Sequence, residues 1–170
     1  MSIKNIVLIG FMGSGKSMTA NRLSEILGRK VISTDKLIEE REGRPISRIF
    51  EESGEPYFRK VEKDVVAEIS KRTSVILDCG GGVVLDAENR ENLKKNGILI
   101  YLSASPYTIY KNIKNRAHRP LLNVKDPRVK IAQLLAERTP LYEQADFVIN
   151  ADHKSIDRIT KDVLKVLENE

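Results

Sequence analysis

The sequence predicts an α/β fold of three layers, α/β/α, built on a five-stranded parallel sheet. Five short β-branched runs recur along the chain, and each is bounded by turn or helix signals. Helical periodicity lies between these runs, and strands that alternate with helices usually pair in parallel beneath two helical layers. The length of 170 residues suffices for one core, so we expect a single domain over residues 1–170.

Each element follows from a local pattern. The expected strands are residues 5–10, 30–35, 74–80, 97–103 and 146–151. The clearest helical patterns are residues 16–27, 55–71 and 155–167. On the first helix, Leu23, Ile26 and Leu27 are expected to share one face. Sheets of this kind bind ligands beyond the carboxyl ends of their strands, so functional residues should follow directly after the runs.

Composition excludes several classes of protein. No apolar run approaches the roughly 20 residues that span a bilayer, and the first residues hold too few apolar positions for a secretory leader, so a cytoplasmic protein without membrane contact is expected. The net charge of +5 comes from basic residues interleaved with acidic ones, which argues against nucleic acid and suits anionic small molecules. The single Cys79 excludes an internal disulfide, and we expect it to be a small buried residue.

The stretch GFMGSGKS at residues 10–17 carries the strongest motif. It follows an apolar strand and precedes a helical pattern, which is the context of a P-loop, so the fold is expected to be of the P-loop NTPase type. Glycines let backbone N–H groups turn toward phosphate oxygens, Lys16 reaches the terminal phosphates, and the Ser17 hydroxyl can ligate Mg²⁺. ATP with Mg²⁺ is therefore expected. The candidate ATP-binding residues here are Gly13, Ser14, Gly15, Lys16, Ser17 and Met18.

A phosphate acceptor needs a carboxylate near its hydroxyl group and cations near its own negative charges. Asp35 follows the second strand, where it can serve the acceptor or cap a helix that begins at Lys36, and position alone leaves both interpretations open. Three glycines at 80–82 end the third strand and let a substrate lie against the backbone. Arg59 and Arg138 are, by themselves, ordinary arginines.

Taken together, these motifs resemble the shikimate kinase family. GFMGSGKS, the TD after the second strand, FRKVE, GGG, RPLL (119–122) and RTPLYE (138–143) occur in the order and spacing of that family, from about residue 5 to residue 145. A P-loop is common to many families, whereas its combination with FR-x-x-E, GGG, RPLL and R-x-PLY is specific.

The resemblance implies transfer of the γ-phosphoryl group of ATP to the 3-hydroxyl of shikimate, on the path to chorismate and the aromatic amino acids. It implies catalytic roles for Asp35, Lys16 and Arg119, with Asp35 bonding the acceptor hydroxyl and Arg119 reaching ATP from a lid. The implied shikimate-binding residues are Asp35, Arg59, Gly80, Gly81, Gly82 and Arg138. The resemblance also implies a substrate-binding helical segment at about 36–62 and a lid at about 112–126.

Neighbouring residues add weaker expectations. Glu62 can orient Arg59 through an i,i+3 contact, which would be weak as an exposed pair. Phe50 and Phe58 can wall the acceptor pocket or belong to the core. His118 and His153 carry no supported role and are expected on surface loops.

The chain departs from the family at two points. The family usually has Asp-x-Asp after the second strand, whereas this chain has Ser33-Thr34-Asp35. Asp78, at the end of the third strand, either supplies the negative charge near Mg²⁺ that Ser33 lacks, or bonds backbone N–H groups of the P-loop. At the adenine end, Arg116 is the nearest arginine to the expected stacking position, but its offset differs.

Two alternative functions stay open from the residues alone. One is another P-loop small-molecule kinase, of the gluconate or nucleoside-monophosphate type. The other is a non-catalytic relative that binds nucleotide as a regulatory module. Paired arginines beside three glycines favour a carboxylate-bearing polyol as acceptor, and a monomer is the default expectation.

Overall fold

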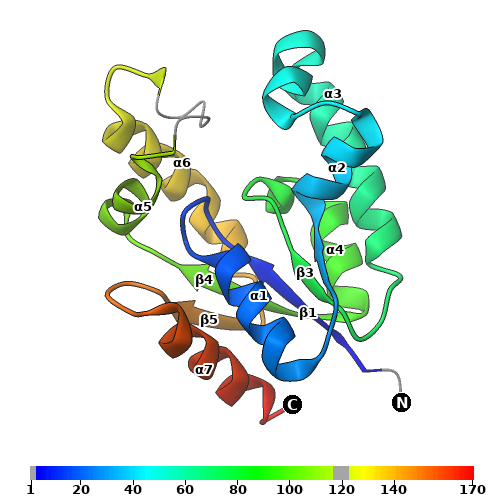
Figure 1. Ribbon diagram of the computed structural model, residues 1–170. Coiled ribbons are helices and arrows are strands. Elements are labelled where there is room, and N and C mark those ends of the chain that lie inside the picture. The colour runs from blue at the N-terminus through cyan, green and yellow to red at the C-terminus, as the bar shows by residue number, and fades with distance from the viewer. Residues whose placement is uncertain (1–2, 117–122) are drawn as a thin grey trace.

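The computed structural model describes residues 3–116 and 123–170 and contains a five-stranded parallel sheet between two helical layers (Figure 1). The predicted fold class is confirmed. The strands are β1 (Asn5–Ile9), β2 (Val31–Ser33), β3 (Ile76–Asp78), β4 (Gly97–Ser103) and β5 (Phe147–Asn150), in the order β2-β3-β1-β4-β5. β1 is the central strand of the sheet. All five of its residues are buried, because a central strand is covered on every side.

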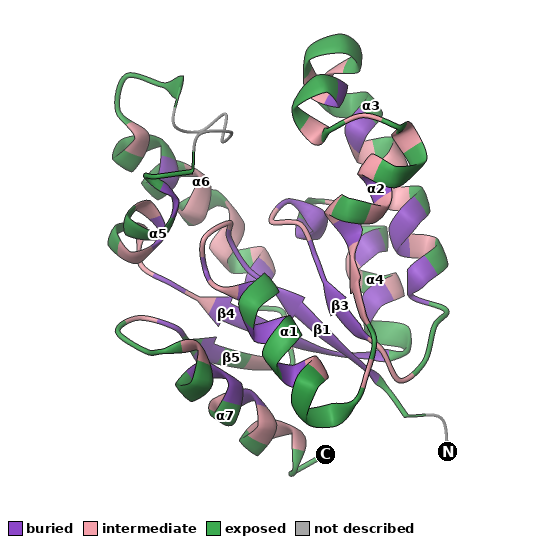
Figure 2. Cartoon of the chain, viewed as in Figure 1, coloured by how far each residue is buried: buried purple, intermediate pink, exposed green. Residues whose placement is uncertain are grey.

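Alternate residues of the strands build two separate cores. Val7 and Ile9 of β1 pack into one core, whereas Ile6 and Leu8 pack into the other. The helices are α1 (Lys16–Leu27), α2 (Thr34–Glu42), α3 (Ile46–Ile69), α4 (Ala87–Lys95), α5 (Pro106–Ile113), α6 (Pro127–Tyr142) and α7 (Ile156–Leu167), with a short 3₁₀ turn at Val83–Leu85. Helices α1 and α7 cover one face of the sheet, and α3 to α6 cover the other (Figures 1 and 2).

The predicted elements match these bounds closely at residues 16–27 and 97–103. The apolar face of α1 is only partly covered: Leu23 is buried, but Ile26 is 51 % and Leu27 is 36 % exposed. A Cβ at Gly28, directly after this last turn, would meet no atom within 4 Å. The apolar face of α1 therefore continues for one turn beyond the part of the helix that packs against the sheet and α7.

A kink divides α3, which explains why the helical pattern starts only at residue 55. Gly54 has φ 80° and ψ 167°, a backbone conformation that side chains rarely tolerate. After the kink, Phe58, Val65 and Ile69 are buried as their spacing predicts. Before it, α2 and the first turns of α3 extend past the sheet and lie across from α5 and α6 (Figure 1).

The predicted loop at 112–126 begins later than expected. Helix α5 continues through Ile113, whose buried side chain packs into the core, so the loop starts after it. Residues 117–122, which include His118 and Arg119, lie outside the described residues. Among the helices of the described ranges, none is both long and apolar enough to span a membrane.

Cys79 is buried, as predicted, and burial raises the pKa of its thiol well above the ordinary value. We expect the native protein to react with an aromatic disulfide reagent only as fast as it opens, because the thiolate is the reacting form. The measurement is thiol release over time, compared with the rate in denaturant. Immediate reaction of the folded protein would show that Cys79 is accessible.

Candidate active site

The P-loop connects β1 to α1 in a shape that requires glycine. Gly10, Gly13 and Gly15 have φ values of 147°, 78° and 95°. A Cβ at Gly10 would lie 2.6 Å from the carbonyl oxygen of Leu102, so the backbone could not approach β4 with any other residue. Helix α1 begins at Lys16 without a side-chain cap, which leaves N–H groups at its positive end to face an anion.

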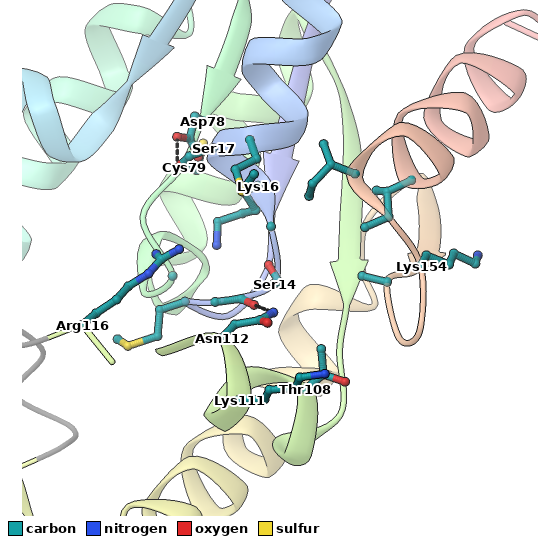
Figure 3. Close-up of a pocket in the computed structure, with 18 of the residues that line it drawn as sticks. Ser14, Lys16, Ser17, Asp78, Cys79, Thr108, Lys111, Asn112, Arg116 and Lys154 are labelled. Atoms are coloured by element: carbon teal, nitrogen blue, oxygen red, sulfur yellow. Dashed lines mark hydrogen bonds between the residues drawn. The ribbon is translucent and has the colours of Figure 1, made fainter. Parts of the chain in front are cut away.

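Lys16 and Ser17 sit at the start of α1. The buried Lys16 ammonium donates hydrogen bonds to the carbonyl oxygens of Gly10 and Phe11, at 2.8 and 2.9 Å. Asn112, from α5, donates to the Gly13 carbonyl at 2.7 Å and so braces the loop from the opposite side (Figure 3). Sequence reasoning assigned no role to Asn112, because this residue was placed in the expected lid at about 112–126 rather than on a helix.

Asp78 faces Ser17. The Ser17 hydroxyl donates a hydrogen bond of 2.6 Å to Oδ2 of Asp78 (Figure 3). Beside the two roles considered for Asp78, the structure shows a further contact of this carboxylate, with the side chain of the P-loop serine. Two oxygens of the kind that Mg²⁺ prefers, one hydroxyl and one carboxylate, are thus adjacent. Among the described residues, no group of three or more His, Cys, Asp or Glu is placed to hold a metal ion.

Ser33 lies beside Asp78 on the neighbouring strand, in register with it. Its hydroxyl accepts a hydrogen bond of 3.3 Å from the Lys36 N–H and caps α2. The alternative that Asp35 caps this helix is therefore wrong: α2 begins at Thr34, and Asp35 belongs to its first turn. The Asp35 carboxylate instead lies against Gly80 at the end of β3.

Two of the three glycines at 80–82 make room for a functional side chain. A Cβ at Gly80 would lie 2.5 Å from Oδ1 of Asp35. A Cβ at Gly82 would overlap both terminal nitrogens of Arg59. At Gly81 the neighbours are less close, with Met12 N at 3.4 Å and Arg138 Nη1 at 3.7 Å. The structure thus brings Asp35, Arg59 and Arg138 together on one loop.

Arg59 is held by two carboxylates of its own helix. Its Nη1 lies 2.9 Å from Oε1 of Glu62, and its Nε and Nη2 donate to Glu55 at 3.3 and 3.2 Å. The expected i,i+3 contact between Arg59 and Glu62 is confirmed, and the pair is not an exposed one, because Glu62 is 1 % exposed. Burial raises the pKa of the Glu62 carboxyl, and the charge of Arg59 opposes that shift. The second oxygen of Glu62 has no hydrogen-bond partner among the described residues.

Aromatic rings support the two arginines. The Arg138 guanidinium lies 5.5 Å from the centre of the Phe11 ring, and Arg59 lies 5.2 Å from the centre of the Phe58 ring. Phe58 is a core residue, and the half-buried Phe50 packs against it at 4.7 Å between ring centres. Of the two interpretations for these rings, Phe58 therefore fits the core.

A cavity of about 770 Å³ runs along this edge of the sheet (Figure 3). Its lining includes Asp35, Gly80 and Gly81, and also Arg116 and His153. His153 is exposed on the loop after β5, as expected, and it also borders this cavity. The cavity is large enough for a small organic ligand beside a phosphate chain.

The chain is similar to proteins of one known family over most of its length. The family described as shikimate kinase matches residues 12–168. The shikimate kinase of Caldanaerobacter subterraneus is 43 % identical over 163 residues, which cover 96 % of this chain and 95 % of that protein. The shikimate kinase of Sulfurihydrogenibium is 43 % identical over 162 residues, with 95 % and 96 % covered.

Solved structures of shikimate kinases are also similar to this chain. The shikimate kinase from Acinetobacter baumannii in complex with shikimate has a TM-score of 0.94 at 36 % identity, and covers 99 % of this chain and 95 % of that one. The shikimate kinase from Aquifex aeolicus has a TM-score of 0.84 at 33 % identity, with 96 % of each chain covered. A gluconokinase from Sinorhizobium meliloti, at 15 % identity and a TM-score of 0.64, shares the fold alone.

A P-loop on a parallel sheet, with a carboxylate and two arginines beyond the neighbouring strands, defines the class of small-molecule P-loop kinases. Within that class, identity of about 40 % over nearly the whole length is decisive. The chain belongs to the shikimate kinase family, and it is an enzyme that transfers a phosphoryl group.

The buried Glu62 makes stability depend on pH. Burial raises the pKa of its carboxyl group above the ordinary value of about 4.3. Between these two pKa values the folded state binds more protons than the unfolded chain. The free energy of unfolding therefore falls as pH rises through this window. Glu62→Gln cannot ionise and should gain stability relative to the wild type as pH rises from about 4 to about 7. Urea unfolding measures this, with the exposed Glu91→Gln as control. A difference between variant and wild type that stays constant with pH would contradict it.

Proposed function

We propose that this chain transfers the γ-phosphoryl group of ATP to the 3-hydroxyl of shikimate, giving shikimate 3-phosphate and ADP in aromatic amino acid biosynthesis. One observation carries the proposal: the triglycine loop, residues 80–82, joins Asp35 and two arginines beside the P-loop. A carboxylate-bearing polyol has one group for each of these. The A. baumannii protein, which bears shikimate, is 36 % identical to this chain.

In this proposal, the acceptor end works through charge and position. Arg59 and Arg138 hold the acceptor carboxylate, since guanidinium groups donate parallel hydrogen bonds to a carboxylate. Asp35 accepts a hydrogen bond from the reacting hydroxyl and takes its proton as the oxygen attacks. The residues Gly80, Gly81 and Gly82 line the same space with backbone rather than side chains. The ion pair with Glu62 keeps the Arg59 guanidinium in place.

At the phosphate end, we assign ATP to the P-loop residues Gly13 to Met18. N–H groups at the start of α1 bind the phosphate oxygens, and Lys16 places its positive charge where negative charge accumulates during transfer. Arg119 is proposed to add a further charge from the lid; this role rests on the sequence, because Arg119 lies outside the described residues. Arg116 lines the cavity and is the candidate contact for adenine.

The adjacent oxygens of Ser17 and Asp78 fit a magnesium site. Bound there with ATP, Mg²⁺ would neutralise phosphate charge. A serine hydroxyl that binds a cation through a lone pair must point its O–H away from the cation. The Asp78 carboxylate accepts the hydrogen bond from this O–H at 2.6 Å. We therefore propose that Asp78 orients Ser17 and contributes the negative charge that Ser33, whose hydroxyl caps α2, does not provide.

Further parts of the proposal concern motion and setting. The segment 36–62, which spans α2 and part of α3, and a lid that follows α5 and extends to about residue 126 are assigned to close on the substrates and exclude water. We propose a cytoplasmic monomer.

An ADP-release assay with several acceptors tests the function. Shikimate should stimulate ADP release strongly, whereas gluconate and nucleoside monophosphates should not. Stimulation by gluconate or by a nucleotide instead would favour another small-molecule kinase. Tight ATP binding without turnover on any acceptor would favour a non-catalytic module.

Arg59→Lys and Arg138→Lys separate the two ends of the site. Each keeps a positive charge but loses the planar fork, and each should raise the KM for shikimate by about 10- to 100-fold, because a hydrogen bond to a charged group contributes about 1.5–3 kcal/mol. The KM for ATP should change by less than about twofold. Arg158→Lys, on the exposed face of α7, is the matched control. Equal losses for both substrates would contradict the assignment.

Asp78→Asn tests the magnesium proposal. The variant should need about tenfold more Mg²⁺ for half-maximal activity, and calorimetry should show that Mg²⁺ no longer strengthens ADP binding as it does in the wild type. Adding Ser33→Asp, which keeps a helix cap, should restore the Mg²⁺ response in part. An unchanged Mg²⁺ requirement in Asp78→Asn, or no rescue by Ser33→Asp, would count against Asp78.

A further inference from the structure

The triglycine loop needs external support to keep one shape. Glycine loses more conformational freedom on folding than any other residue, so three in succession form an intrinsically flexible segment. Two hydroxyl groups from distant parts of the chain hold this segment. The Gly80 N–H donates to Oγ1 of Thr34 at 2.8 Å, and the hydroxyl of Tyr142 donates to the Gly81 carbonyl at 2.5 Å.

Both supporting residues are fully buried, and both are close in sequence to proposed acceptor-binding residues. Thr34 is the first residue of α2 and directly precedes Asp35. Tyr142 is the last residue of α6 and lies one helical turn after Arg138, on the same side of the helix. Each hydroxyl therefore ties the loop to the helix that carries one of the groups facing the acceptor.

The Tyr142 hydroxyl is well placed to set the orientation of a peptide group. In a trans peptide the carbonyl of one residue and the N–H of the next point in opposite directions. Holding the Gly81 carbonyl toward α6 thus turns the Gly82 N–H away from α6. The Tyr142 ring is itself fixed, because it stacks on Tyr101 of β4 with ring centres 4.9 Å apart. Burial raises the pKa of Tyr142 to about 12, so the hydroxyl keeps its proton near neutral pH.

We propose that Thr34 and Tyr142 are positioning residues for the acceptor: their hydroxyl groups hold the triglycine loop in the conformation in which Asp35, Arg59 and Arg138 face one bound acid. The inference rests on the proposed function for the identity of that acid. It goes beyond it in assigning a role to two residues that need not touch the substrate. The P-loop is held separately, by Lys16 and Asn112, so nucleotide binding should not depend on these two hydroxyls.

The test measures shikimate and ADP affinity by calorimetry in Thr34→Val and Tyr142→Phe. Each variant removes one hydroxyl and keeps the shape of the side chain. Each should weaken shikimate binding by about tenfold, while the affinity for ADP stays within about twofold. The double variant should lose less than the product of the two single losses, because both hydroxyls act on one loop.

Matched controls separate positioning from general destabilisation. Thr160→Val removes another buried hydroxyl, on α7, and Tyr101→Phe keeps the ring that stacks on Tyr142. Both should bind shikimate like the wild type. Thr34→Ser retains a hydroxyl and should restore the affinity that Thr34→Val loses, which keeps the test decisive even where Tyr142→Phe folds poorly.

Three outcomes are distinguishable. Unchanged shikimate affinity in Thr34→Val and Tyr142→Phe overturns the inference, and so do equal losses of shikimate and ADP affinity. Failure of the wild type itself to bind shikimate overturns the proposed function instead.

Discussion

The acceptor end of the site depends on the absence of side chains at residues 80–82. Gly80 and Gly82 occupy positions where a single added carbon would overlap Asp35 and Arg59, so the carboxylate and the guanidinium can approach the end of β3 only over bare backbone. A glycine run in such a place is usually explained by room for a substrate. Here the protein's own carboxylate and guanidinium group occupy that space, and the substrate is proposed to bind to these two groups.

The sheet order explains why the two ends of the reaction meet. Strands β2, β3 and β1 are neighbours and run in parallel, so the segments that follow them emerge at one edge: Asp35 after β2, the triglycine loop after β3, and the P-loop after β1. The buried carboxylate of Glu62 faces Arg59 from within α3 and offsets the positive charge there, while burial raises the pKa of this carboxyl group against the opposing effect of Arg59.

The sequence alone predicted much of this arrangement, for physical reasons that can be named. The P-loop is a local motif whose glycines and lysine act through the nearby backbone, and the strands are short apolar runs that are legible without tertiary context. Burial was harder to predict. Helical spacing placed Glu62 beside Arg59 and Ile26 on the same face as Leu23, but spacing shows which residues share a face and not how far each is buried, and Glu62 is buried whereas Ile26 is exposed. The helix cap at Ser33 and the contacts of Thr34, Asn112 and Tyr142 were not foreseen, since each depends on elements brought together only by the fold.

The most direct measurement of the central claim is the dissociation constant of shikimate for Gly82→Ala, determined by calorimetry beside that of ADP. Gly82 has φ −93°, which alanine adopts without strain, so the substitution acts through its added carbon and not through the backbone. The account predicts that the displaced Arg59 weakens shikimate binding at least about tenfold, with ADP binding within about twofold of the wild type. Shikimate binding equal to that of the wild type would contradict it.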